Sequence, residues 1–215
     1  MIDYQWTAFP TIGYIKAKLT EESLLPVINE INLLKNNKSL SNDRIANKSL
    51  AGQIKQEYDL IDSKPYLENL ILPYIKGFDN TFKYGKSVDV LTKNLPIKLH
   101  TAWVNFQEKY EHNPLHNHSG IYSFVIWKTI PYDIELEKNL HPGKNSEGCT
   151  AGIFEFVYSN TVGGIYTQRI EVSKKDENTL LVFPAKLFHQ VYPFYTSNDI
   201  RVSISGNFAY DASKI

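Results

Sequence analysis

The sequence predicts an α+β fold, with helices in the first third and an antiparallel β sandwich or barrel after it. Before residue 95, apolar residues recur at i, i+3 and i+4, as on one face of a helix. After residue 95, short β-branched and aromatic runs alternate with turn residues, as in antiparallel sheets. Helices that precede strands in this way pack on the outer face of a β core.

The chain is 215 residues long and 42% apolar, which fits one domain with a well-packed core. We therefore expect a single domain over residues 1–215. Its first part, 1–94, is expected to be mainly helical, and 95–215 is expected to form the β core.

The first helix is expected over EESLLPVINEINLLK, residues 21–35, with Thr20 as its N-cap. The next segment, NNKSLSNDR at 36–44, is rich in turn residues and is expected to be a loop. A second helical stretch covers 64–85, where Pro73 predicts a kink or a break.

Segment 131–150, PYDIELEKNLHPGKNSEGCT, shows no clear period and is expected to be a long surface loop at one mouth of the β core. The expected strands share β-branched and aromatic character; they are IKLHTAWVNF (97–106), GIYSFVIWKTI (120–130), AGIFEFVYS (151–159), GIYTQRIEV (164–172), TLLVFPAKLFHQVYPF (179–194) and IRVSISGNFAY (200–210).

Charge and cysteine content argue against several classes of partner and site. Basic and acidic residues both number 23, so no net charge attracts nucleic acid or an anionic membrane. Cys149 is the only cysteine, which excludes an intramolecular disulfide and cysteine-based metal clusters. The start, MIDYQWTAFP, lacks the pattern of a signal peptide, and no apolar run is long enough to span a bilayer. We expect a cytoplasmic protein with no membrane contact.

A candidate metal site begins in EHNPLHNHSG, residues 111–120. His116 and His118 are two residues apart, so in an extended strand they project from one face about 6.6 Å apart. Two imidazoles placed in this way can share one metal ion. An H-x-H pair alone is weak support, since polar loops contain such pairs by chance, and His112 is interpreted as a loop residue.

His189 lies in an otherwise apolar and aromatic run. A lone histidine on such a strand is more often a core residue than a ligand. The pair at His116 and His118, on another expected strand, supplies the partners that a metal-binding His189 would need.

The last expected strand alternates in a way that gives it two different faces. Arg201, Ser203, Ser205 and Asn207 share one face, opposite an apolar face formed by Val202, Ile204 and Phe208. One interpretation is a half-exposed edge strand with Arg201 in solvent. The other is a clamp in which Arg201, one of only three arginines, and Ser203 bind a carboxylate.

The order of these motifs resembles the 2-oxoglutarate/iron(II)-dependent oxygenase superfamily. An H-x-[DEH] pair comes first, a histidine follows about seventy residues later, and an R-x-S lies about a dozen residues beyond that histidine. The segments WVNF…HNPLHNHSG and VFPAKLFHQVYPF…IRVSISGNF look most like its small oxygenases of bacteria and phages. The resemblance covers roughly 97–210. In addition, NKSLAGQIKQEYDL, from Asn47 to Leu60, is similar to a motif of the same group, without a role that the sequence reveals.

The resemblance implies a double-stranded β-helix, or jelly-roll, core with the helices packed outside it. It also implies a dioxygenase that uses Fe(II) and 2-oxoglutarate, in which decarboxylation to succinate drives hydroxylase-type oxidation of a substrate. His116 and His189 match the histidine ligands, Arg201 matches the residue that pairs with the distal carboxylate, and Ser203 matches the assisting hydroxyl. Asn105, on the preceding strand, is a further candidate contact to the cosubstrate.

One position departs from the family pattern of two histidines and one carboxylate, because His118 stands where Asp or Glu is usual. Three neutral imidazoles leave the site one negative charge short. Alternatively, His118 is the first ligand of an H-x-G arrangement with Gly120, and the carboxylate position is vacant. We favour three histidine ligands, because the i, i+2 geometry is direct.

Two other classes of protein stay open at this point. A cupin-type metalloprotein shares the jelly roll and the H-x-H pair, but it normally adds a glutamate a few residues later, and here no carboxylate follows until Asp133. A non-catalytic jelly-roll binding protein would use the histidines only to fill a pocket. The substrate, a small molecule or a peptidyl group, is not identified by the sequence, and a homodimer through the helical part also stays open.

Overall fold

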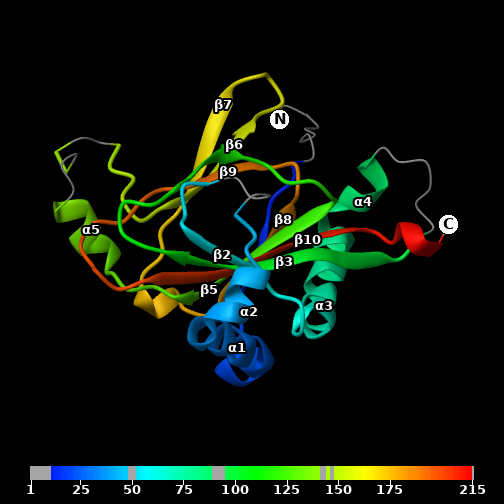
Figure 1. Cartoon of the computed structure of the whole chain (residues 1–215). Coiled ribbons are helices and arrows are strands. Elements are labelled where there is room, and N and C mark those ends of the chain that lie inside the picture. The colour runs from blue at the N-terminus through cyan, green and yellow to red at the C-terminus, as the bar shows by residue number, and fades with distance from the viewer. Residues whose placement is uncertain (1–10, 48–51, 89–94, 141–143, 146–147, 215) are drawn as a thin grey trace, which may run out of the picture.

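The protein is described by a computed structural model that covers residues 11–47, 52–88, 95–140, 144–145 and 148–214. Two antiparallel sheets face each other, and helices lie beneath the larger one (Figure 1). The larger sheet has the order β1 (Ile15–Lys18), β8 (Thr179–Pro184), β5 (Tyr122–Thr129), β10 (Arg201–Tyr210), β3 (Ile97–Gln107) and β2 (Gln56–Asp59). The smaller sheet has the order β4 (Asn113–His116), β9 (Phe188–Val191), β6 (Phe154–Ser159) and β7 (Ile165–Ile170).

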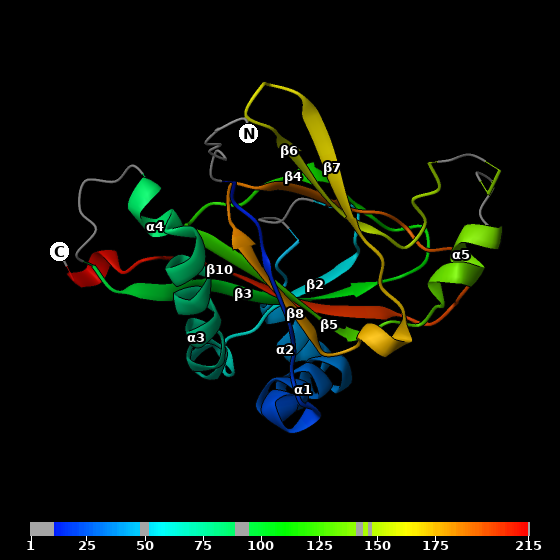
Figure 2. The ribbon, with the colours of Figure 1, turned by 180° about the vertical axis from the view of Figure 1, so that it is seen from behind.

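The helices lie on the outer face of the larger sheet, except for one at an end of the sandwich. Figure 2, from behind, shows α1 and α3 against that face and α5 at the end away from α4. This arrangement confirms the predicted α+β architecture with helices outside a jelly-roll core. The α-helices are α1 (Glu21–Asn36), α2 (Lys38–Asp43), α3 (Lys64–Phe82), α4 (Tyr84–Ser87) and α5 (Ile134–Leu140), and the short 3-10 turns are Lys174–Asp176 and Ala212–Lys214.

The larger sheet separates two apolar cores because its strands alternate. On β5, Phe124 and Ile126 face the helices, whereas Val125 and Trp127 face the smaller sheet. The helix side is filled by buried residues of α1 and α3, among them Leu24, Val27, Ile31, Leu67, Ile71, Ile75 and Phe78. The second core fills part of the space between the sheets, and polar side chains of β3 and β10 line a cavity beside it.

Three local predictions need correction. The segment expected to be a loop at 36–44 contains α2, because the Asn37 side chain accepts a hydrogen bond from the Leu40 amide and starts a new turn. Of the kink or break expected at Pro73, the break does not occur, since α3 continues to Phe82. The expected long loop at 131–150 contains α5, where Asp133 accepts hydrogen bonds from the amides of the first turn.

The part before residue 95 also contributes two strands that the sequence did not predict. Strand β1 pairs with β8, and β2 pairs with β3, each at an edge of the larger sheet. Both are short, and only one of their two faces meets the core, so they lack the apolar runs used to recognise strands. The first helix, in contrast, begins as predicted, with the Thr20 side chain accepting from the Ser23 amide.

Within the described residues, the helices fall short of the length and apolar character that a bilayer-spanning segment needs.

Candidate active site

Three histidines converge between the sheets. His116 ends β4 and is the direct register partner of His189 on β9. The ring of His118 completes the group, with centroids 4.3 to 5.0 Å apart in the three pairs. One potential ligand atom from each ring lies within 4.8 Å of the other two. This spacing suits three nitrogens around a single metal ion.

His118 reaches this group by a different route from the one expected. Strand β4 ends at His116, so the two histidines do not project from one extended strand. Instead, the backbone amide of His118 donates to the Ala185 carbonyl, which anchors the loop after β4 to the segment between β8 and β9. Gly120 then turns the chain with a φ of 99°, where a side chain would strike the Phe208 carbonyl.

Hydrogen bonding and burial keep the three histidines neutral and leave a free ring nitrogen on two of them. The Nδ1 atoms of His116 and His189 lie 2.7 and 3.0 Å from the carbonyl oxygens of Pro114 and Leu187. A carbonyl only accepts, so each Nδ1 carries the hydrogen and each Nε2 lone pair is free. Burial lowers the pKa of His116, and burial together with His116 lowers the pKa of His118 to about 3.

Burial and the two neighbouring histidines also hold the pKa of His189 well below its usual value. The aromatic rings of Phe154 and Phe183, with centroids 5.5 and 5.0 Å from that of His189, form much of this apolar environment. At neutral pH all three imidazoles therefore present uncharged nitrogens.

The polar face predicted for the last strand is present and faces inward. Strand β10 lies between β5 and β3 near the middle of the sheet, so the edge-strand interpretation is wrong. Val202, Ile204 and Phe208 pack toward the helices. Arg201, Ser203 and Ser205 instead line the cavity that also contains the histidines.

Arg201 is almost fully buried, with 2% of its surface exposed. Its guanidinium donates to Gln107 Oε1 through both Nε and Nη2, and to the Tyr132 hydroxyl at 2.7 Å. The rings of Tyr132 and Phe194 lie 5.8 and 5.7 Å from its guanidinium carbon. All of these groups are uncharged.

The other two arginines, unlike Arg201, each form an ion pair with a carboxylate. Arg44 pairs with Glu30, and Arg169 pairs with Glu155. Among the described residues, no carboxylate forms an ion pair with Arg201. A buried cation that has only neutral partners is costly, so this end of the cavity is suited to an incoming anion.

A second polar row crosses three strands beside Arg201. In the sheet register, Ser203 on β10 lies opposite Asn105 on β3, which lies opposite Glu57 on β2. The Asn105 amide donates to Ser203 Oγ at 3.1 Å. Glu57 is buried, and burial followed by the charge of Glu111 raises the pKa of its carboxyl to about 7.

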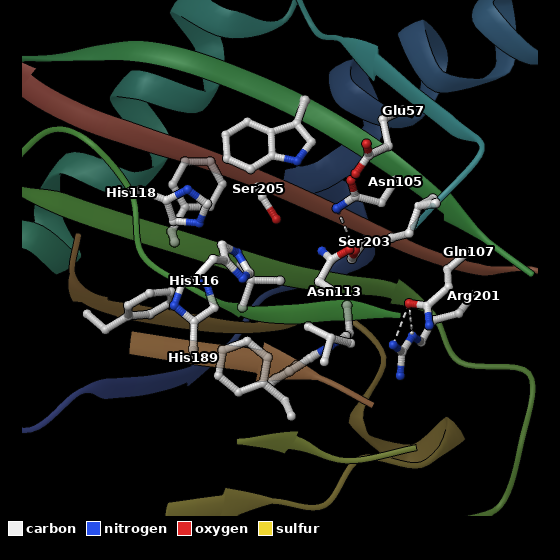
Figure 3. Close-up of a pocket in the computed structure, with 18 residues that line it drawn as sticks. Glu57, Asn105, Gln107, Asn113, His116, His118, His189, Arg201, Ser203 and Ser205 are labelled. Atoms are coloured by element: carbon white, nitrogen blue, oxygen red, sulfur yellow. Dashed lines mark hydrogen bonds between the residues drawn. The ribbon is translucent and has the colours of Figure 1, made fainter. Parts of the chain in front are cut away.

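These groups line one cavity that is partly open to solvent. Figure 3 shows the histidines at one end, Arg201 with Gln107 at the other, and Ser203, Ser205 and Asn113 between them. The structure thus brings together all six residues proposed from the sequence, namely Asn105, His116, His118, His189, Arg201 and Ser203.

Sequence reasoning missed other residues of this cavity. Gln107 follows Asn105 by two residues on β3, so strand alternation would have placed both on one face. Glu57 lies in the segment from Asn47 to Leu60, which was recognised as a motif without a role. Trp103 and Asn113 also line the cavity, and no pattern in the sequence marked them as site residues.

Residues 101–207 match a family described as "Putative 2OG-Fe(II) oxygenase". The chain belongs to this family of 2-oxoglutarate- and iron(II)-dependent oxygenases. The match includes every histidine of the cluster together with Arg201 and Ser203, and the oxygenase is therefore an oxidoreductase whose family uses iron(II) and 2-oxoglutarate. A search among curated proteins gave no match.

Solved structures agree on the fold of the oxygenase. A prolyl-4-hydroxylase from Pseudomonas putida is 13% identical, with a TM-score of 0.54, and the match covers 94% of this chain and 95% of that one. A prolyl hydroxylase from Trichoplax adhaerens, solved with a peptide fragment, is 13% identical, with a TM-score of 0.53 and coverage of 95% and 86%. The epimerase SnoN of nogalamycin biosynthesis is 14% identical, with a TM-score of 0.54 and coverage of 93% and 78%. These similarities show the double-stranded β-helix fold.

Proposed function

We propose that His116, His118 and His189 hold iron(II) in this oxygenase, and that Arg201 with Ser203 binds the distal carboxylate of 2-oxoglutarate. The observation that carries this proposal is the buried guanidinium of Arg201, which has no ion-pair partner among the described residues and lies in the same cavity as three neutral imidazoles. Imidazole nitrogen is a suitable donor for iron(II). The residues present therefore fit both groups.

When bound, iron(II) and 2-oxoglutarate supply oxidation of a substrate by dioxygen, coupled to decarboxylation of 2-oxoglutarate to succinate. The chain provides the setting for this chemistry. Arg201 would exchange its neutral acceptor Gln107 for a carboxylate, which compensates its buried charge. Asn105 holds Ser203 toward the cavity through its amide hydrogen bond, so its role toward the cosubstrate is indirect.

The departure from the usual ligand set has a definable consequence. With His118 in place of a carboxylate, the three ligands contribute no negative charge. Iron(II) should therefore bind more weakly than at a site with a carboxylate. The anion that binds at Arg201 then supplies a larger share of the negative charge in the cavity.

The first prediction tests Arg201. With iron(II) and 2-oxoglutarate under anaerobic conditions, the wild-type chain should show a visible charge-transfer band and a higher melting temperature. Arg201→Gln should keep the metal-dependent rise but bind 2-oxoglutarate at least about 30-fold more weakly, because a buried charged hydrogen bond is lost. Titration of the band and of the melting temperature measures both effects.

Arg169→Gln is the matched control, since it removes the same charge from a pair outside the cavity. It should leave 2-oxoglutarate binding unchanged. Metal stabilisation without any effect of 2-oxoglutarate in the wild type would favour a cupin-type protein instead. If neither ligand affects the wild type, the histidines only fill a pocket.

A further inference from the structure

We propose that Glu57 and Asn105 form the recognition site for a protonated nitrogen group, an amine or a guanidinium, on the primary substrate. The proposal rests on the proposed function, because it assigns 2-oxoglutarate to Arg201 and metal to the histidines. It gives the segment from Asn47 to Leu60 a role, which is to place an acidic side chain in the cavity.

The first observation is a pair of unsatisfied acceptors. Glu57 and Asn105 are 2% and 5% exposed, and both line the cavity. Glu57 Oε1 and Asn105 Oδ1 are buried without a hydrogen-bond partner among the described residues. Figure 3 shows the two groups side by side. Buried acceptors without donors are costly, so this wall of the cavity is suited to a ligand that brings hydrogen.

The acceptor pair is held in place by its surroundings. Asn47 brackets the strand, since its side chain donates to the Ile54 carbonyl at 2.6 Å and accepts from the Glu57 amide at 3.2 Å. The Lys55 amide donates to Glu111 Oε1 at 3.2 Å, which ties the segment to the loop before β4. These hydrogen bonds therefore fix the backbone that carries Glu57, and a binding site requires side chains that are held in place.

Neither cofactor can satisfy these oxygens. At neutral pH, 2-oxoglutarate carries two carboxylates and a keto group, which only accept hydrogen bonds. The metal is assigned to the three histidines, and Glu57 does not belong to that cluster. The remaining reactant, the substrate, can bring the donors that Glu57 and Asn105 lack.

The electrostatics favour a cation over a neutral donor. Among the described residues that line the cavity, Glu57 is the only one with a carboxyl group. Burial and the charge of Glu111 raise the pKa of the Glu57 carboxyl to about 7, and a cation bound beside it would favour the ionised form. Trp103, 5% exposed and two residues before Asn105, adds an aromatic wall that tolerates a cation.

The test measures binding of methylguanidinium to the metal-free full-length chain by NMR titration. N-methylurea, a neutral molecule of the same shape, is the comparison. Methylguanidinium should bind the wild type about tenfold more tightly than N-methylurea, because a charged hydrogen bond is stronger than a neutral one. Glu57→Gln should abolish that preference, and its melting curve checks that it folds.

Glu108→Gln is the matched control, since Glu108 carries the same charge on the nearby exposed surface. It should keep the full preference for methylguanidinium. A wild type without the preference, or a Glu57→Gln variant that retains it, would overturn the proposal. The second result is also expected if the Asn105 amide is rotated and donates to Glu57.

A second titration separates this proposal from the proposed function. In the chain loaded with diamagnetic zinc(II) and 2-oxoglutarate, methylguanidinium should bind as tightly as without them, which marks a distinct substrate site. Competition with 2-oxoglutarate would overturn the substrate assignment and leave the oxygenase intact. If 2-oxoglutarate itself fails to bind, the proposed function fails, and the substrate assignment falls for that separate reason.

Discussion

At the scale of single residues, the candidate site depends on groups whose environment changes their chemistry. Burial keeps His116, His118 and His189 neutral, and the carbonyl contacts of two of them select the free nitrogen. Arg201 donates only to uncharged groups among the described residues. The cavity therefore combines three neutral imidazoles at one end with a guanidinium that has no ion-pair partner among the described residues at the other.

One prediction at this scale distinguishes the two ligand sets considered for the metal. If all three histidines bind, His116→Ala and His118→Ala should each lower the affinity for iron(II) or zinc(II) at least about tenfold. Removing a residue that only supports a ligand already costs about that much, and removing the ligand itself should cost no less. If His118 is instead the first ligand of an H-x-G site, His116→Ala should have no effect. Anaerobic metal titration measures both affinities.

His112→Ala serves as the control for these substitutions, because His112 lies outside the histidine cluster. It should bind metal as the wild type does. His189→Ala should abolish metal binding but leave the chain folded. Unfolding of His189→Ala would mark that residue as part of the core instead.

At the scale of elements, β10 positions the site because it lies between two partners. It pairs with β3 on one side and β5 on the other, and its alternation separates the polar cavity from the helix-facing core. Gly206 on β10 lies where a side chain would have no room. A Cβ there would lie 2.6 Å from Phe124 Cε1 and 2.7 Å from the Thr101 carbonyl oxygen.

Gly206→Ala should therefore lower the free energy of unfolding by about 1–3 kcal/mol, since overpacking a core strand forces the backbone or the ring to move. Urea unfolding measures the change. Gly148→Ala is the matched substitution, because an added Cβ there has nothing within 4 Å. Equal losses in the two variants would show that the contact at Gly206 is relieved without cost.

At the scale of the whole molecule, one face of the larger sheet packs against the helices and the other face lines the candidate site. Its outer face is buried by α1 and α3, while its inner face holds the polar row and Arg201. The helices thus stabilise the sheet from the face opposite to the polar row and Arg201.

This separation predicts that Ile71→Ala, at a fully buried position of α3, destabilises the fold without weakening metal binding. The loss should be about 2–5 kcal/mol, as for other large-to-small changes in a core. Leu33→Ala, on the same layer but 57% exposed, should cost much less. Urea unfolding and metal titration of both variants check this, and a matching loss of metal affinity in Ile71→Ala would contradict it.

Local patterns in the sequence by themselves determined the helical first part, the strands after residue 95 and the two faces of β10, whereas the six candidate site residues also depended on the family resemblance. Such features follow from periodicity and from residue type, which are properties of neighbouring positions. The edge strands β1 and β2 were not predictable in this way, because their pairing depends on partners far along the chain.

Tertiary structure alone decided how the site is assembled. Only the fold shows that His118 enters from a loop anchored at Ala185, that β10 is central, and that Arg201 lacks an anion among the described residues. Only the register of β2 on β3 places Glu57 opposite Asn105 in the cavity. These facts depend on contacts between distant segments and on burial, which no local pattern encodes.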